Sequence, residues 1–245
     1  MDIIPVLDLM HGLVVRGVAG QRDSYQPIQS CLTKSSTAAD VASAIHQTFG
    51  FTKFYVADLD AIVSDQPNQQ LIDELTAAGF TLMLDVGVRS VEHLRSIKPA
   101  SNTSVIIALE SIESLDTVAA ALDQLGSERI IFSLDLKHGN LLGHPTGLKS
   151  GNPERVVDQV VDLGVHRVIL LDLAAVGMGT GIPTLDLCEL VRAQHPELQI
   201  ITGGGVSCTG DLKNAYQASV NGLLIASALH DGRVVPADLA TIETP

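Results

Sequence analysis

The chain has 245 residues, 46% of them apolar and 3% aromatic, with no Trp, so its core must consist of Val, Ile, Leu and Ala, as in a parallel sheet covered on both faces. A net charge of −13, from 28 acidic and 15 basic residues without a basic run, argues against nucleic-acid and anionic-membrane partners. Three widely spaced cysteines argue against structural zinc and disulfides, and no apolar run approaches the roughly 18 residues of a membrane span, so we expect a cytoplasmic protein without metal or organic cofactor.

Short apolar segments that predict strands alternate with helical segments along the whole chain. The strand segments are 2–8, 53–58, 81–86, 104–108, 130–135, 167–172, 198–202 and 222–226. The helical segments lie near 37–48, 67–78, 90–97, 114–124, 152–162, 184–194, 209–217 and 235–242. No linker interrupts the series. We therefore predict an α/β fold, a single (βα)8 TIM barrel over residues 1–245, with its functional residues at the C-terminal ends of the strands.

The opening strand recurs in the middle of the chain. Residues 4–12 read IPVLDLMHG and residues 131–139 read IFSLDLKHG, so both are an apolar strand followed by an Asp and a His-Gly turn. Later strands of the two halves match in the same order. This pattern predicts an internal duplication with half-barrel repeats of about 1–125 and 126–245. The alternative is the general likeness among βα units of any barrel.

Asp8 and Asp135 end the first and fifth predicted strands, which lie opposite each other in an eight-stranded barrel. Two carboxylates that face one mouth from opposite sides can divide general acid and general base work. Turn capping is the alternative for a single Asp, but the symmetric pair favours catalysis. Asp58 and Asp172 end the second and sixth strands and are candidate substrate-binding residues, with structural capping equally open.

The loops after the seventh and eighth strands form the usual phosphate cradle of a barrel. Here they are rich in glycine and small residues, although a tight turn is the alternative. The predicted phosphate-binding residues are Gly203, Gly204, Gly205, Ser207, Ala226 and Ser227. The corresponding loops of the first half carry Asp85 and Glu110, so we expect no phosphate there.

Two further loops border the predicted mouth. The glycine-rich segment 177–181 after the sixth strand, with Gly179 and Thr180, could act as a lid or a second backbone cradle, or be an ordinary loop. Arg16 in the first loop places a cation above the mouth. We predict that these three residues contact a substrate.

The opening strand motif, the segment 132–135 and the segment 203–207 resemble the histidine-biosynthesis barrel family. That family contains the phosphoribosylformimino aminoimidazole carboxamide ribotide isomerase and the cyclase subunit of imidazole glycerol phosphate synthase. The resemblance covers the full chain. It implies an Amadori-type aldose–ketose isomerase, or less directly a lyase, that acts on a phosphorylated sugar or related small phosphate. It places a base at Asp8 and a second active-site carboxylate at Asp135.

The sequence also departs from the family pattern. The family's Gly-Gly-Gly-Ile-Arg loop and Gly-Thr strand end are replaced by the segments 85–89 and 108–110, and segment 175–178 has no catalytic acid. These changes predict a divergent paralogue with a single phosphate site. The alternatives are the histidine-pathway isomerase itself, a paralogue in one-carbon (methanopterin-type) cofactor metabolism, and a non-catalytic phosphate-binding barrel or partner subunit. The pattern leaves open whether the protein is a monomer or a homo-oligomer.

Overall fold

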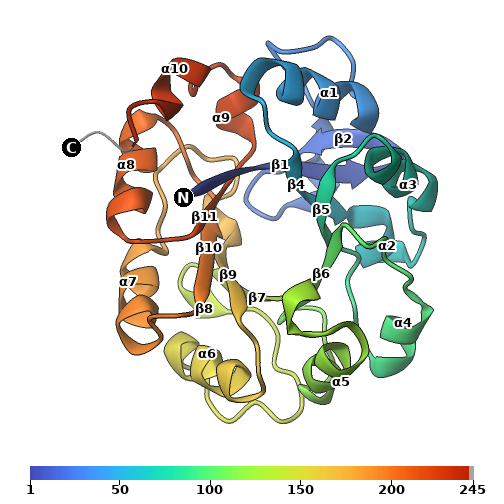
Figure 1. Ribbon diagram of the computed structural model, residues 1–245, viewed down its shortest axis with the longest axis vertical. Coiled ribbons are helices and arrows are strands. Elements are labelled where there is room, and N and C mark those ends of the chain that lie inside the picture. Colours follow the sequence, from blue (N-terminus) through green and yellow to red (C-terminus); the bar gives the residue numbers. More distant parts are fainter. Residues whose placement is uncertain (243–245) are drawn as a thin grey trace.

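The computed structural model describes residues 1–242 and contains a closed parallel barrel surrounded by helices (Figure 1). Parallel pairing between β11 and β1 closes the barrel. The barrel strands, in order around it, are β1 (Asp2–Met10), β4 (Lys53–Asp58), β5 (Thr81–Asp85), β6 (Thr103–Ala108), β7 (Ile130–Lys137), β9 (Arg167–Asp172), β10 (Gln199–Gly203) and β11 (Gly222–Ile225). The predicted (βα)8 TIM barrel is confirmed.

The helices on the outside begin at capping residues that the sequence supplies. Thr37 accepts a hydrogen bond from the Asp40 amide at the start of α1, and Asn152 caps α6 in front of Pro153. The α-helices are α1 (Ala38–Phe49), α2 (Leu59–Ser64), α3 (Gln69–Ala77), α4 (Val91–Ser96), α5 (Asp116–Leu125), α6 (Pro153–Asp162), α7 (Leu185–Gln194), α8 (Thr209–Gln217), α9 (Ser227–His230) and α10 (Pro236–Leu239). Three single-turn 3-10 helices are η1 (Arg22–Ser24), η2 (Ser127–Arg129) and η3 (Leu173–Ala175).

One predicted helix is shorter in the structure than expected, and two short helices were not predicted. The helix expected over 235–242 is only the short α10, and the sequence analysis did not predict α2 and α9. Each of these helices has six residues or fewer. An apolar period of 3.6 residues cannot be recognised over so short a stretch.

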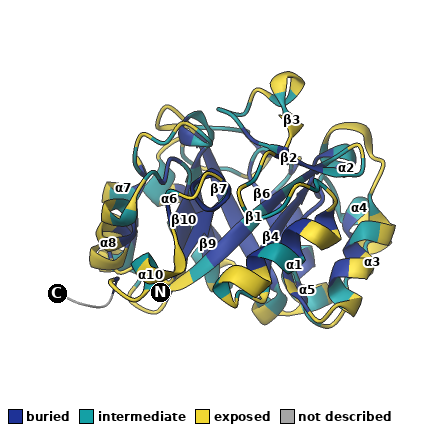
Figure 2. Cartoon of the chain, turned by 90° about the horizontal axis from the view of Figure 1, so that it is seen from above, coloured by how far each residue is buried: buried dark blue, intermediate teal, exposed yellow. Residues whose placement is uncertain are grey.

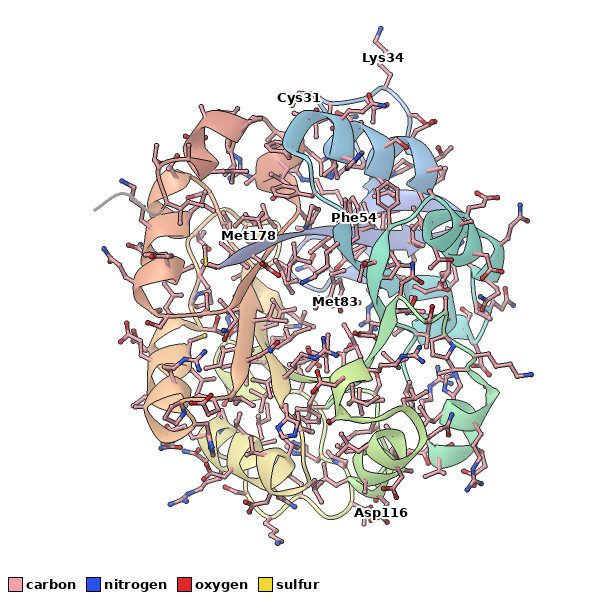
Figure 3. The ribbon with its side chains drawn as sticks, in the orientation of Figure 1. Cys31, Lys34, Phe54, Met83, Asp116 and Met178 are labelled. Carbon is pink, nitrogen blue, oxygen red and sulfur yellow. The ribbon has the colours of Figure 1, made fainter. Side chains whose placement is uncertain are left out.

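Alternation along the strands divides the core into two layers. In β4, Phe54 and Val56 pack outward against the helices, whereas Tyr55 and Ala57 face the barrel interior. Figure 3 shows Phe54 between the barrel and its outer helices and Met83 near the centre of the barrel. The strands are buried almost throughout, and the exposed residues lie on the outer helices and loops (Figure 2). The layer inside the barrel is mainly aliphatic, whereas Phe54 and Phe132 belong to the layer between the barrel and the helices.

Two strands continue beyond the boundaries predicted for them. β1 runs on to Met10 and pairs with β2 (Leu13–Arg16), and β7 runs on to Lys137 and pairs with β8 (Asn140–Leu141). The first hairpin extends further to β3 (Gln26–Pro27), above the barrel mouth (Figure 2). Asp8 and Asp135 therefore lie within strands and not at their ends.

The two hairpin turns have the same conformation. His11 and Gly12 have φ of 53° and 76°, and His138 and Gly139 have φ of 52° and 76°. Positive φ at both central residues is the geometry of a type I′ hairpin turn. This agreement supports the predicted duplication, which stays a prediction, and the last three residues of its second repeat lie outside the described chain. No helix within residues 1–242 is long and apolar enough to cross a membrane.

Candidate active site

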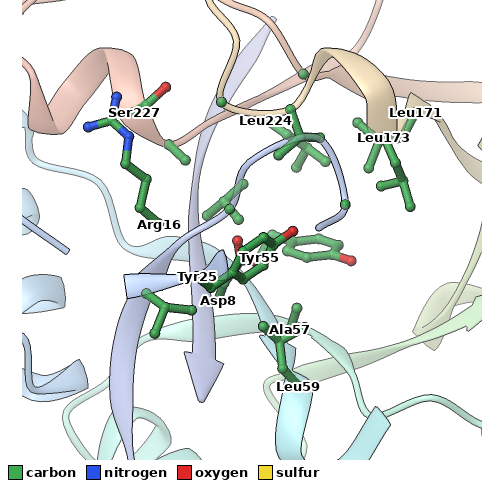
Figure 4. A pocket seen from close by; sticks show the side chains of 18 of the residues that line it. Asp8, Arg16, Tyr25, Tyr55, Ala57, Leu59, Leu171, Leu173, Leu224 and Ser227 are labelled. Carbon is green, nitrogen blue, oxygen red and sulfur yellow. The ribbon is translucent and has the colours of Figure 1, made fainter. Parts of the chain in front are cut away.

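A cavity opens at the C-terminal ends of the barrel strands, where the fold positions functional residues. Most of its lining is apolar, from residues such as Leu171 and Leu224 (Figure 4). Its charged lining is dominated by four carboxylates, Asp8 of β1, Asp85 of β5, Glu110 after β6 and Asp135 of β7. Acidic side chains gathered in a largely apolar hollow repel one another and lose hydration, which makes their ionisation unfavourable.

Asp8 lies beneath the loop that follows β2. Its Oδ2 atom is so close to Gly17 that a Cβ atom on Gly17 would lie 2.7 Å away. Figure 4 shows Asp8 beside Tyr25 and Tyr55. Loss of hydration raises the pKa of Asp8 to about 7, opposed by Arg22 and reinforced by Asp85. The carboxyl group can therefore exist in both protonation states near neutral pH.

Asp135 faces the cavity from the opposite strand and is 5% exposed. Its Oδ1 atom accepts a hydrogen bond of 2.8 Å from the Ser133 hydroxyl, whereas its Oδ2 atom has no hydrogen-bond partner. Burial raises the pKa of Asp135 to about 8, and the charges of Glu110 and Asp85 add to the effect. Asp135 is therefore mainly protonated at neutral pH, and it is a weaker acid than Asp8.

Tyr55 stands between these carboxylates. Its hydroxyl group donates to Asp85 Oδ2 over 3.3 Å, and the Gly87 amide donates to Asp85 Oδ1. Burial raises the pKa of Tyr55 well above its usual value, and the charges of Asp85, Asp135 and Asp8 raise it further. Desolvation likewise raises the pKa of Asp85 to about 6. Tyr55 is thus a neutral donor at the centre of an acidic cluster.

Arg22 brings a cation to this cluster from the first loop. Its Nη2 atom lies 2.7 Å from Glu110 Oε1, so an ion pair bridges two loops that are 88 residues apart in sequence. The same loop donates from the Ala19 amide to the Val176 carbonyl, in the loop after β9. Gly177 packs so closely on this loop that a Cβ atom there would lie 2.1 Å from the Gly17 carbonyl oxygen. The first loop therefore covers the mouth and holds Arg22 and Tyr25 over it.

Of the predicted phosphate-binding residues, Gly204, Gly205, Ala226 and Ser227 line the cavity. Gly203 packs against Leu224 instead.

The remaining predicted phosphate residue, Ser207, lies outside the cavity lining. Its amide and its hydroxyl group both donate to Asp211 Oδ2, each over 2.7 Å. The sequence analysis missed Arg233, which donates to the Ser227 hydroxyl over 3.2 Å and lies against Gly179. Phosphate binding by these residues stays a prediction, and the position of Arg233 beside them follows only from the fold.

Arg16 lines the cavity, but its guanidinium group is already engaged. Its Nη1 and Nη2 atoms donate to the two oxygens of Asp231, each over 2.7 Å. Asp231 also accepts from Arg233. Such a bidentate pair fixes the guanidinium plane. The positive charge of Arg16 is therefore balanced by Asp231. Substrate binding by Arg16 stays a prediction.

The carboxylates of Asp58 and Asp172 serve as backbone caps. Asp58 accepts from the amides of Ala61 and Asn68, and Asp172 accepts from the amides of His138 and Gly139. Neither of the two lines the cavity. Capping therefore accounts for both groups, and we leave them out of the proposed site.

The predicted residues Gly179 and Thr180 also lie outside the cavity lining. Gly179 sits beside Arg233, and Thr180 is exposed over a neighbouring hollow.

Two further groups belong to the lining but escaped the sequence analysis. Tyr25 approaches Asp8 from the first loop, and His230 is buried with its Nδ1 atom 2.9 Å from the Ser30 hydroxyl. Burial lowers the pKa of His230 to about 4, so it is neutral at physiological pH. Within residues 1–242, no group of three or more His, Cys, Asp or Glu side chains is arranged to hold a metal ion.

Comparison with known proteins agrees with this architecture. The family model described as "Histidine biosynthesis protein" matches residues 2–235. An uncharacterized protein of Methanocaldococcus jannaschii is 32% identical over 236 residues, covering 95% of this chain and 94% of its own.

Two named relatives are 1-(5-phosphoribosyl)-5-((5-phosphoribosylamino)methylideneamino) imidazole-4-carboxamide isomerases. The one from Syntrophomonas wolfei is 28% identical over 242 residues, covering 96% of this chain and 95% of its own. The one from Alkaliphilus metalliredigens is 26% identical over 242 residues, covering 96% of each chain. With its barrel, its acidic mouth and a family match along nearly its whole length, the chain belongs to the histidine biosynthesis protein family.

Proposed function

We propose that the protein is an isomerase that converts a phosphorylated aldose derivative into the corresponding ketose by acid–base catalysis. The observation that carries this proposal is the placement of Asp8 and Asp135 on opposite strands of one cavity, with pKa values raised to about 7 and about 8. Groups with pKa values near the working pH are the most effective proton-transfer catalysts. The isomerase names of the relatives support the same reaction class.

We assign Asp135 as the acid and Asp8 as the base, because Asp135 is the more deeply buried carboxyl group and burial favours its protonated form. Asp135 keeps its proton at neutral pH and donates it to the ring oxygen of the substrate, which opens the sugar ring. Asp8, in its ionised form, removes the proton from C2, the carbon next to C1 of the opened sugar. Asp8 then returns a proton to C1 of the resulting enol, and the C2 hydroxyl proton passes to Asp135, so the ketose forms and both carboxyl groups return to their starting states without any oxidant or reductant. Tyr55 holds the acidic residues apart and donates to Asp85.

The phosphate group of the substrate binds at the loops after β10 and β11. Gly204, Gly205 and Ser227 line the cavity there, and Arg233 donates to the Ser227 hydroxyl. Phosphate binding at these loops is the usual arrangement in barrels of this kind. Its binding energy orients the sugar between the two Asp residues. We expect Arg233→Met to weaken the binding of inorganic phosphate about tenfold, measured by calorimetry.

The catalytic assignment is tested by proton exchange at carbon in deuterated buffer, followed by NMR over a panel of phosphorylated aldosylamines. We expect Asp8→Asn and Asp135→Asn each to slow exchange at least about 100-fold. The control is Asp123→Asn, an exposed residue of α5. If both active-site variants exchange at the rate of this control, the assignment is wrong.

The second candidate function is a non-catalytic phosphate-binding barrel. It is favoured by the segment around Val176, which has no carboxylate and is engaged with the first loop. It predicts tight phosphate binding with no proton exchange in the wild-type protein. A separate alternative, that the protein is the histidine-pathway isomerase itself, is tested by complementation of a histidine auxotroph that lacks this enzyme. We expect no complementation, because Asp85 and Glu110 occupy the loops where a second phosphate would need donors.

A further inference from the structure

The side of the mouth opposite the phosphate cradle is acidic. Asp85, Glu110 and Asp135 come from the consecutive barrel strands β5, β6 and β7 or the loops after them, whereas the cradle lies at β10 and β11 across the barrel. Arg22 is the one cation within residues 1–242 that is paired with this group. Asp135 keeps its proton in the free protein, so Asp85 and Glu110 against one guanidinium group leave an uncompensated negative charge beside an apolar cavity.

The carboxylate oxygens of this group do not all accept a hydrogen bond. Glu110 is paired with Arg22, and Asp85 accepts from Tyr55 and from a backbone amide. Asp135 is 95% buried, and its Oδ2 atom has no hydrogen-bond partner. A buried polar atom of this kind is costly unless a ligand or water completes it.

We propose that this side of the mouth binds a protonated amine, carried by the substrate at the end remote from its phosphate group. The inference rests on the proposed function, because it takes the phosphate to lie at the β10 and β11 loops. An ammonium group offers three donors and no acceptor, so it can share the charge of Asp85 and Glu110. It can also donate to Asp135 Oδ2 once Asp135 has passed its proton to the ring oxygen. A second phosphate would be repelled by the same residues.

The proposed amine also has a consequence for catalysis. A positive charge next to Asp135 stabilises the ionised form that remains after proton transfer, so it lowers the pKa of that residue from about 8 toward neutrality and favours the transfer. The acid would then be most effective only with the correct ligand in place. A metal ion is a less suitable occupant, because no three ligating side chains within residues 1–242 are arranged around one point.

The test compares two probes that differ only in their remote group, aminohexyl phosphate and hydroxyhexyl phosphate. We expect the wild-type protein to bind the amino compound about tenfold more tightly in calorimetry at low salt. In Glu110→Gln and in Asp85→Asn the preference should fall to about threefold or less. The matched control is Glu113→Gln, an exposed residue close to Glu110, which should keep the full preference. Circular dichroism verifies that each variant is folded.

The outcomes separate the two proposals. If both probes bind equally well to the wild-type protein, the amine inference is overturned while the phosphate cradle stands. If neither probe nor inorganic phosphate binds, the proposed function fails at the cradle. The amine inference is then tested by comparing the binding of hexylamine and hexanol. Selective binding of hexylamine that is lost in Glu110→Gln supports the inference. Equal binding of the two compounds overturns it. Displacement of the amine by equimolar Mg²⁺ or Mn²⁺ would identify a metal site and overturn it as well.

Discussion

Replacing Asp135 with Asn should make the protein more stable in alkaline solution and should change the pH dependence of its stability. The Asp135 carboxyl is 5% exposed, and its pKa is raised from 3.8 to about 8. Between these two values the unfolded chain is ionised at this position while the folded protein keeps its proton. The free energy of unfolding therefore falls as pH rises from about 4 to about 8 and is level above that.

The size of this effect follows from the same two pKa values. Each pH unit between them is worth about 1.4 kcal/mol, which sets an upper limit of about 6 kcal/mol. We expect about 2 kcal/mol, because the carboxyl group borders a cavity that water can enter. Asn cannot ionise, and its side-chain oxygen can still accept from the Ser133 hydroxyl. The variant should therefore gain about 2 kcal/mol over the wild-type protein between pH about 5 and about 9.

The assay is urea denaturation followed by circular dichroism over this pH range, with Asp123→Asn as the exposed control. The contributions of Asp8 and Asp85 are present in every protein compared and cancel to first order. If the stability difference between Asp135→Asn and the wild-type protein stays constant within about 0.5 kcal/mol, Asp135 ionises normally in the folded state and the reasoning is refuted.

Two further predictions concern the loop over the mouth. A Cβ atom at Gly177 would lie 2.1 Å from the Gly17 carbonyl oxygen, whereas one at Gly139, which also has positive φ, meets nothing within 4 Å. Trypsin should therefore cleave after Arg22 about tenfold faster in Gly177→Ala than in Gly139→Ala. Equal cleavage rates in the two variants would contradict the close packing of Gly177 on the first loop. Arg22→Gln removes a cation that lowers the pKa of Asp8, so this pKa should rise above about 7 in carboxyl NMR titration. An unchanged or lower value would exclude Arg22 as a neighbour of Asp8.

The paired aspartates illustrate what could be predicted. Each follows an apolar run of nearly the same sequence, and the spacing of the other strands places the two on opposite sides of a barrel. The prediction included the His-Gly turns but not the continuation of both strands into hairpins, because a turn alone does not show that the chain pairs back on the preceding strand. Two-residue turns with positive φ at His and Gly extend the pairing instead.

The environment of the aspartates was largely beyond prediction. Tyr55 lies in the largely apolar segment 53–58, and nothing in that local sequence indicates that its hydroxyl group faces acidic residues. Arg16 was expected to face the ligand as a free charge, yet its partner Asp231 lies 215 residues away in the chain. Such long-range ion pairs leave no local pattern.

The sequence by itself determined the order of the eight barrel strands and of the longer helices, and the acidic residues and glycines near the C-terminal ends of the strands. These properties depend on apolar periodicity and local turn chemistry, which act over a few residues. Only the tertiary structure decided which charges are compensated. Barrel closure brings Arg22 to Glu110 and Arg16 to Asp231, and leaves Asp135 without a partner for one oxygen. Contacts between residues distant in the chain exist only once the barrel has closed, and they distinguish the carboxylates that line the cavity from those that cap backbone amides.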